Sequence, residues 1–485
     1  MAGAQLLSGD VAPADVAIVG CGPVGALLAN LLGQAGLAVD IYDREREVYA
    51  LPRAVHFDGE VMRIFQAAGL ADRIAAATRA SPYGARYEDP SGRTLLIRRG
   101  TDGPGPQGWS GSWYFHQPLL EEILREGLAR FPNVRVHLGH EVGSVDELGA
   151  HYVVGCDGAR SLVRHAIGSR QVDLGMHQPW LVVDLLCDPD SPRTQALPLH
   201  SLQFCDPARP MTLVNVNGRR RRWEIMLMPG DDQDRLTEPE IFWPMIGRWL
   251  GPEDARIERA AVYTFHSIVQ EGWRKGRLLL AGDSCHQTPP FLGQGMCAGL
   301  RDAANLAWKL AAVLKNGAPD PLLDTYESER RPHVTEFIEL AVRLGAVIQA
   351  TDPAMVAERD RRFAAGAETF DFPQAQLGPG CRAEAPPPVG TIFPQPRLAD
   401  GQLMDEAIGQ RFAIPGDAEI LAGLDTTATL LPGVASDWLA QHDARAVILR
   451  PDRYIFALAR NRAELESAIE ALQRSIQARS EPVTL

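Results

Sequence analysis

A glycine-rich turn near the start of the chain limits the folds that this sequence can adopt. The segment Gly20-Cys21-Gly22-Pro23-Val24-Gly25 follows a short apolar run at residues 15–20 and precedes a helical pattern with an apolar face. In such a unit the first glycine permits a tight turn, the second admits a pyrophosphate, and the third lets helix and strand pack closely. The helix N-terminus then faces the phosphate charge. The pattern predicts a Rossmann-like unit that binds an adenine dinucleotide.

An acidic residue is present at the position where a dinucleotide-binding unit usually has one. Asp43 ends a second strand-like run at residues 38–42, about 20 residues after the motif. A carboxylate at that offset can accept hydrogen bonds from ribose hydroxyls, and we expect the adjacent Arg44 at the same end of the cofactor. A plain glycine turn is the alternative interpretation of the motif.

Two further segments favour FAD over NAD. Asp157-Gly158 ends one apolar strand, and Gly282-Asp283 follows another. An Asp that leaves a strand beside a helix can bind ribityl hydroxyls. The turn at 293–296 precedes a helix at 299–315, so its backbone N–H groups suit the negative charge of a reduced isoalloxazine. Each segment alone could be a turn, but the three in this order predict an FAD site.

Charge and cysteine content exclude several classes of protein. The net charge of −13 disfavours binding to nucleic acid. The seven cysteines are scattered, without a C-x-x-C pair, so we expect no disulfide framework, no metal centre and a reducing, cytoplasmic location. Residues 16–39 contain no charged residue but are interrupted by five glycines and a proline, so we expect no membrane anchor.

The length of 485 residues predicts two or three domains of α/β class. Strand-like runs such as 180–185 and 223–228 indicate an antiparallel sheet inserted between two halves of the nucleotide domain. A proline-rich stretch follows the second half, and a small α/β module ends the chain. The expected division is 1–170 plus 271–370 for FAD, 171–270 for the substrate, 371–397 as a linker, and 398–485 as the C-terminal domain.

These motifs resemble those of the group A flavoprotein aromatic hydroxylases, and within them the 3-(3-hydroxyphenyl)propionate hydroxylase type. The resemblance extends over nearly the whole chain and includes a C-terminal region similar to the family's thioredoxin-like domain, here without a redox cysteine pair. It is carried by residues 52–58 (Pro-Arg-Ala-Val-His-Phe-Asp), 115–118 (Phe-His-Gln-Pro), 205–210, 220–224 (Arg-Arg-Arg-Trp-Glu), 282–309 and 329–333.

The resemblance implies an enzyme with non-covalent FAD that is reduced by NADH or NADPH. With O2, a flavin C4a-hydroperoxide would then hydroxylate a phenolic small molecule. A homodimer is compatible with this interpretation. The implied cofactor contacts are Asp43, Arg44 and Arg53 on the adenosine side, Gln117 and Asp283 at the ribityl chain, Asp157 and Gly158 in their turn, and Pro290, Gly293, Gly295 and Met296 along the isoalloxazine.

Candidates for catalysis and substrate binding are less sharply defined. His56 lies on the segment expected beside the isoalloxazine, where it is either a proton relay or a structural histidine. Asn215, Met226, Met228 and Pro290 are candidate substrate contacts, but the sequence leaves open which face of the middle sheet lines the pocket. We see no single arginine that must bind a substrate carboxylate.

Other functions remain open at this stage. The same cofactor chemistry on a polyketide-like substrate would give hydroxylation, epoxidation or Baeyer–Villiger insertion, because pocket residues decide the outcome. A flavin-bound scaffold without catalysis is a further alternative. A flavin-dependent halogenase is disfavoured, since the first lysine of the chain is Lys275 and no Trp-x-Trp-x-x-Ile-Pro segment is present.

Overall fold

The computed structural model describes residues 13–49, 53–373 and 375–476. Its N-terminal part is the expected strand–turn–helix–strand unit, with α1 (Pro23–Gln34) between two neighbouring strands. These strands belong to a six-stranded sheet that is parallel except at β15. The sheet order is β15 (Arg274–Lys275), β16 (Leu278–Leu280), β9 (Ala150–Gly155), β1 (Ala14–Val19), β2 (Val39–Asp43) and β8 (Val134–Leu138).

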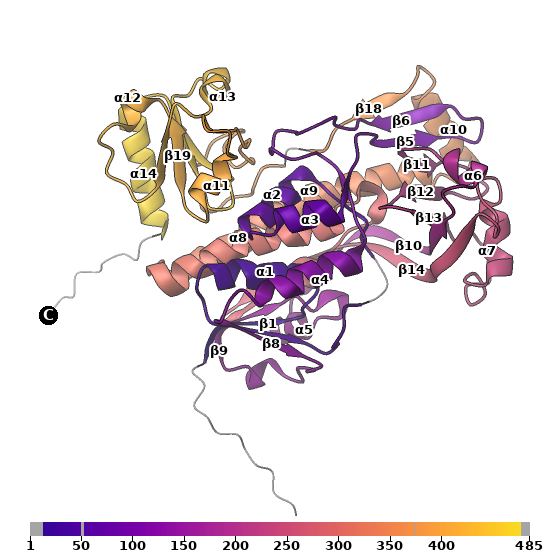
Figure 1. Ribbon diagram of the computed structural model, residues 1–485, viewed down its shortest axis with the longest axis horizontal. Helices are drawn as coiled ribbons and strands as arrows, with labels where there is room; N and C mark the ends of the chain where they lie inside the picture. The colour runs from indigo at the N-terminus through magenta and orange to yellow at the C-terminus, as the bar shows by residue number, and fades with distance from the viewer. Residues whose placement is uncertain (1–12, 50–52, 374, 477–485) are drawn as a thin grey trace, which may run out of the picture.

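Helices cover this sheet because its central strands are apolar on both faces. The helix α1 packs against α4 (Gln117–Leu128) and against the long α8 (Gly295–Asn316). Figure 1 shows α8 and α9 (Thr325–Ile348) running through the middle of the molecule. The remaining helices of this layer are α2 (Gly59–Ala67), α3 (Ala71–Ala77) and α5 (Leu162–Ile167).

A nine-stranded, mostly antiparallel sheet forms the other end of the molecule. Its order is β17 (His286–Gln287), β14 (Ala255–Glu271), β10 (Arg170–Cys187), β13 (Arg220–Met226), β12 (Met211–Asn215), β11 (Ser201–Phe204), β5 (Ala85–Glu88), β6 (Thr94–Arg98) and β18 (Glu368–Phe370). Four of these strands come from outside residues 171–270, and Figure 1 shows β5 and β6 beside the distant β18. The hairpin β5–β6 and β18 extend a sheet whose β11 would otherwise be an exposed edge.

One face of this sheet is closed by α7 (Pro239–Ile246). Trp223 and Ile225 of β13 pack there with Phe242 of α7. Because side chains alternate along a strand, Arg222 and Glu224 must lie on the other face. The short helices α6 (Pro192–Gln195) and α10 (Pro353–Arg362) complete this end of the molecule.

The C-terminal unit has a thioredoxin-like arrangement. Its sheet order is β20 (Thr429–Pro432), β19 (Ala413–Gly416), β21 (Ala446–Leu449) and β22 (Ile455–Ala459), with β19 and β20 parallel and the other pairs antiparallel. The helices are α11 (Met404–Ile408), α12 (Ala418–Leu421), α13 (Ser436–Gln441) and α14 (Arg462–Ile476).

The proline-rich segment before this unit is packed rather than extended into solvent. Val389 and Phe393 are buried in the core of the C-terminal unit. The backbone N–H groups of Cys381 and Gly378 bind Glu329 of α9. Proline removes donors and restricts φ, but it does not prevent neighbouring apolar side chains from packing.

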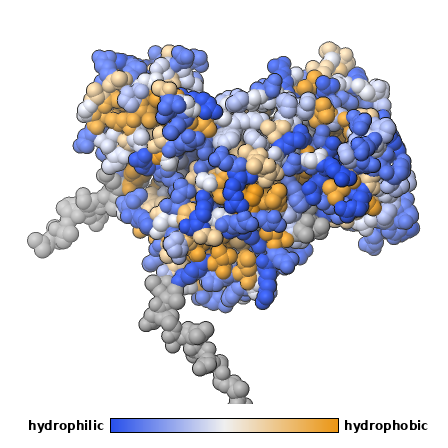
Figure 2. All heavy atoms as spheres, viewed as in Figure 1, coloured by the Kyte–Doolittle hydropathy of each residue, from blue (hydrophilic) through white to orange (hydrophobic). Residues whose placement is uncertain are grey.

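None of the helices in the described part of the chain combines the length and hydrophobicity needed to cross a bilayer. Hydrophilic residues cover much of the face in Figure 2, and hydrophobic residues appear on it in separate groups.

Candidate active site

A cavity of about 700 Å³ runs from the glycine motif to the inner face of the nine-stranded sheet. This volume lies in the range of small-molecule and cofactor sites. The lining begins at Asp43 and Gly22, passes Asp157, Asp283 and the 290–296 loop, and ends at the strands of the sheet. Residues far apart in the sequence thus share one continuous space.

The three motif glycines are needed for different reasons. Gly20 has φ +103°, and a Cβ there would overlap the Cys156 carbonyl. A Cβ at Gly25 would overlap the Gly20 carbonyl. A Cβ at Gly22, by contrast, would meet no atom within 4 Å, and Gly22 lines the cavity as the N-cap of α1. Open space directly over a helix N-terminus is what a pyrophosphate requires.

The residues expected on the adenosine side lie together at one end of the cavity. Asp43 accepts hydrogen bonds from the backbone N–H groups of Cys21 (2.7 Å) and Glu45 (2.9 Å), so it also holds the glycine turn. Arg44 and Arg53 line the same end. The Gln117 side-chain oxygen accepts from the N–H groups of Arg53 (2.8 Å) and Ala54 (2.7 Å). Gln117 therefore lines the cavity, and its side-chain oxygen fixes the backbone of residues 53–54.

Asp157 and Asp283 lie where their strands end. Asp157 Oδ2 accepts from Leu162 N–H at 2.7 Å, whereas Oδ1 is buried and has no partner among the described residues. Asp283 is exposed to the cavity. Because the surrounding protein keeps bulk solvent away from both carboxyls, their pKa values are raised. For Asp283 this effect outweighs the opposing interactions with His286 and Arg53.

The loop that precedes α8 supplies the remaining cofactor candidates. Pro290 begins a short 3-10 turn, Gly293 follows it with φ +67°, and Gly295 begins the helix. Met296 lines the cavity beside them. Thr288 Oγ1 and Gln294 Nε2 are buried polar atoms that lack partners among the described residues. Together with Asp157 Oδ1, these atoms fit a large polar ligand such as FAD, which would satisfy them.

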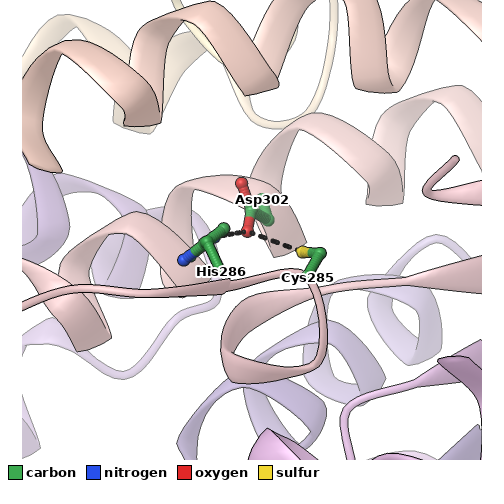
Figure 3. Close-up of side chains that lie close together, drawn as sticks. All are labelled: Cys285, His286 and Asp302. Carbon is green, nitrogen blue, oxygen red and sulfur yellow. Dashed lines mark hydrogen bonds and ion pairs between the residues drawn. The ribbon is translucent and has the colours of Figure 1, made fainter. Parts of the chain in front are cut away.

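A buried cluster fixes the Gly282–His286 turn to α8. Figure 3 shows His286 and Cys285 pointing toward Asp302, with His286 Nε2 at 2.6 Å from Asp302 Oδ2. Arg330 Nε donates to the other Asp302 oxygen at 2.9 Å, and burial keeps the pKa of the Cys285 thiol well above its usual value. Three potential ligand atoms lie close together here, but the guanidinium neutralises the carboxylate and the sulfur is a thiol. The cluster fits a structural anchor better than a metal site.

His56 lies in a three-stranded sheet formed by β3 (His56–Phe57), β7 (Trp113–Tyr114) and β4 (Arg79–Ala80). It lines the cavity near Gly293 and bonds Ser112 Oγ through Nε2 at 2.8 Å. Burial and the nearby charge of Arg98 lower the His56 pKa to about 3. The imidazole is therefore neutral near pH 7, which suits a fixed hydrogen-bonding group rather than a base that titrates near neutrality.

The inner face of the nine-stranded sheet presents polar side chains to the cavity. The lining includes Thr212 and Val214 of β12 and Arg222 and Glu224 of β13. Glu224 is buried, its contact with Arg222 is at 3.9 Å, and burial raises its pKa. Arg222 itself binds Asp184 with Nε–Oδ1 at 2.7 Å.

Three of the four expected substrate contacts lie outside this lining, and only Pro290 belongs to it. Asn215 has the parity of Met211 and Leu213, which face α7, so alternation directs it away from the cavity. Met226 has the parity of Arg222 and Glu224 and packs with Trp180 and Phe291 without lining the cavity, and Met228 lies beyond the end of β13. The roles of these three residues in substrate binding stay predictions.

Comparisons with known proteins agree with this geometry. Residues 13–341 match the family model described as FAD binding domain, and residues 431–475 match the HcaD C-terminal domain. The chain is 36% identical over 510 residues to the probable NADH-specific resorcinol 4-hydroxylase of Rhodococcus jostii (strain RHA1), with 95% of each chain covered. The chain belongs to the FAD-binding family of flavoprotein aromatic hydroxylases.

A further relative and a solved structure are similar along most of their length. The 3-(3-hydroxy-phenyl)propionate/3-hydroxycinnamic acid hydroxylase of Escherichia coli (strain SMS-3-5 / SECEC) is 33% identical over 528 residues, with 93% of each chain covered. The solved structure of aklavinone-11 hydroxylase with FAD and aklavinone shares the fold, with a TM-score of 0.78 at 21% identity over 96% of this chain and 100% of that one. The expected fold class, the FAD cofactor and the oxidoreductase class are confirmed.

Sequence reasoning missed several cavity residues of this flavoprotein hydroxylase. Tyr87 and Arg98 come from the β5–β6 hairpin, which we had not predicted to join the middle sheet. The short apolar run in residues 94–98 (Thr-Leu-Leu-Ile-Arg) is a weak strand signal, and nothing in it indicates the partner strand. Arg222 and Glu224 belong to residues 220–224, which carried the family resemblance. The sequence did not show which side of the sheet they face, and only the packing of α7 against the opposite side shows it.

Proposed function

We propose that the protein hydroxylates a phenolic small molecule, with FAD as cofactor, NADH as reductant and O2 as oxygen donor. The observation that carries the proposal is the continuous cavity, which joins the FAD-binding motifs to an enclosed space walled by the sheet. The names of relatives that act on resorcinol and on hydroxyphenylpropionate support a phenol, and one of those names specifies NADH.

The chain would hold FAD along the first half of this cavity. Gly22 and the N-terminus of α1 would receive the pyrophosphate, and Asp43, Arg44 and Arg53 would surround the adenosine. When bound, FAD supplies the redox chemistry, accepting hydride from NADH and activating O2.

The loop before α8 would meet the flavin ring. Asp157, Gly158 and Asp283 would face the ribityl chain, with Gln117 acting through the 53–54 segment. The backbone N–H groups at Gly293, Gly295 and Met296 would face the isoalloxazine, beside Pro290.

The nine-stranded sheet would position the phenol and keep water away. Glu224 is a carboxylate in that wall with a raised pKa, so we assign it the role of accepting the proton of the substrate hydroxyl. His56 would remain a neutral hydrogen-bonding group at the other side of the ring.

This assignment divides the chain functionally. Residues 1–170 and 271–370 would hold FAD, and 171–270 would bind the substrate with help from β5, β6 and β18. Residues 371–397 and 398–485 would support this core. Because all seven cysteines are free thiols, we place the reaction in the reducing cytoplasm.

The test is NADH oxidation by the FAD-loaded protein with a panel of phenols, with hydrogen peroxide assayed alongside. We expect resorcinol or 3-(3-hydroxyphenyl)propionate to accelerate NADH oxidation with little peroxide and to yield a hydroxylated product. Acceleration with stoichiometric peroxide would identify a ligand that is not the substrate. If NADH oxidation were absent with every compound, the monooxygenase proposal would be rejected.

A further inference from the structure

The Arg98 side chain is the starting point for an inference about the substrate. Arg98 is the last residue of β6, and only 9% of it is exposed to solvent. It lines the cavity. The guanidinium carbon lies 4.8 Å from the centroid of the Phe372 ring, and no acidic group in the described part of the chain pairs with Arg98.

Arg222 and Arg125, two other arginines of the cavity that are shielded from solvent, differ in this respect. Arg222 binds both oxygens of Asp184, and Arg125 lies 3.7 Å from Asp43. A guanidinium shielded from water is unfavourable without a counter-charge, and buried charges in proteins are therefore generally paired. Arg98 thus lacks a negative partner in the protein, in a position where a ligand can supply one.

The surroundings of Arg98 indicate what kind of molecule would carry that charge. Tyr87, Phe291 and Phe370 line the cavity with it, and strand β18 places Phe370 directly opposite Arg98. These rings form an apolar, aromatic wall beside one cation. Such a wall favours a flat aromatic ligand, and the cation favours an ionised oxygen on that ligand.

The position of Arg98 in the cavity indicates which ligand would carry the negative charge. Arg98 influences His56 electrostatically, and His56 lies against Gly293 of the loop assigned to the flavin ring. The phosphate-binding features of the glycine motif line the opposite end of the cavity. An anion at Arg98 would therefore belong to the compound being hydroxylated.

We propose that Arg98 is a specificity-determining residue that binds an ionised oxygen, carboxylate or phenolate, of the aromatic substrate. This inference rests on the proposed hydroxylase function. It implies that a phenol carrying an anionic group is preferred over a neutral analogue of the same size.

The test uses FAD-loaded full-length protein and the variants Arg98→Met and Arg98→Lys. The matched control is Arg86→Met, on the neighbouring strand β5, where the side chain is exposed and does not line the cavity. The ligands are 3-(3-hydroxyphenyl)propionate, its uncharged methyl ester and resorcinol. Binding is measured by the change in flavin absorbance and by equilibrium dialysis, and turnover by NADH oxidation.

If the anion is a carboxylate, Arg98→Met should weaken binding of the propionate about 10- to 100-fold. Binding of the ester and of resorcinol should change less than about threefold, and Arg98→Lys should restore part of the loss. If the anion is the phenolate, all three ligands should weaken together, and the pH at which bound phenol ionises should rise in Arg98→Met.

The proposal is overturned if Arg98→Met binds all three ligands as the wild type does. It is also overturned if the variant changes only the FAD affinity or the KM for NADH, since Arg98 would then serve the cofactor or the reductant. Equilibrium dialysis measures binding without turnover, so it distinguishes failure of the Arg98 proposal from failure of the proposed hydroxylase function. A wild type that binds the propionate through Arg98 but never oxidises NADH would refute the hydroxylase function alone.

Discussion

The Arg63 guanidinium of α2 binds both carboxylate oxygens of Asp405 in α11, with Nε–Oδ2 at 2.6 Å and Nη2–Oδ1 at 2.9 Å. Both side chains are buried, and Arg453 of the C-terminal unit adds a contact to Asp405 at 3.0 Å. This pair joins the FAD-binding part to the thioredoxin-like unit, 342 residues away in sequence. The C-terminal unit is therefore held by specific buried charges as well as by apolar packing.

Breaking this pair should destabilise the protein strongly. Asp405→Asn leaves two buried arginines without their carboxylate, which costs about 3–5 kcal/mol of unfolding free energy. Denaturant unfolding measures the loss. The control Arg73→Met removes an exposed ion pair with Glu126 and should cost less than about 1 kcal/mol. Equal effects of the two variants would contradict the assigned role of Asp405.

Substitution by alanine should have different effects on stability and FAD affinity at two glycines of the motif. Gly25→Ala forces a Cβ onto the Gly20 carbonyl and should greatly reduce the stability of the apoprotein. Gly22→Ala has room and an ordinary backbone conformation (φ −75°), so the apoprotein should fold normally while FAD affinity falls at least about tenfold. Thermal unfolding and FAD titration check both, with Gly149→Ala as an open-glycine control outside the cavity. Wild-type FAD affinity in Gly22→Ala would exclude a pyrophosphate at that position.

The Asp302 cluster should behave as an anchor and not as a metal site. Asp302→Asn leaves the buried Arg330 uncompensated, so stability should fall by about 3–5 kcal/mol. FAD affinity should fall too, because the Gly282 N–H loses its carboxylate partner and the turn that carries Asp283 loosens. Zn²⁺ or EDTA should leave the wild-type Tm unchanged. A Zn²⁺-induced rise in Tm that Cys285→Ser abolishes would show that the cluster binds metal.

His56 should make stability depend on pH in acid. Its folded-state pKa is lowered to about 3 from a usual value near 6.5, so below pH 6.5 the unfolded chain binds a proton that the native protein does not. Stability should therefore fall as pH decreases from 6.5 toward 3, by about 1.4 kcal/mol per pH unit from this group. His56→Asn should lose this slope, whereas His151→Asn, at an exposed position, should keep it. Parallel pH profiles for all three proteins would contradict a buried neutral His56.

Glu224 should control the pH dependence of turnover. Burial raises the pKa of Glu224, so its side chain ionises at a pH above the usual range of a carboxyl group. Wild-type kcat should therefore rise with pH over the interval in which Glu224 ionises. Glu224→Gln should lower kcat about 100-fold and flatten this rise while FAD affinity is kept. The control is Glu258→Gln, because Glu258 binds Arg220 and does not line the cavity. Unchanged kcat and pH profile in Glu224→Gln would assign the proton to another group.

Local pattern was enough to predict the FAD-binding half of the site. The glycine motif and the Asp-Gly and Gly-Asp strand ends each depend on a turn between neighbouring elements, and such turns are encoded within a few residues. The same reasoning predicted the 293–296 loop and its helix, which the structure places along one cavity. The family resemblance then extended the prediction from FAD binding to the hydroxylation of a phenol, which the comparisons support.

Tertiary structure alone decided the substrate half. Strand alternation predicts two faces for β13, but only the packing of Phe242 against Trp223 shows that Glu224, and not its neighbours, faces the cavity. Arg98 reaches the same space because β5 pairs with β11, more than 100 residues later in the chain. Pairing between distant strands depends on side chains that no local window contains, so the residues that we propose to select the substrate could be identified only in the folded chain.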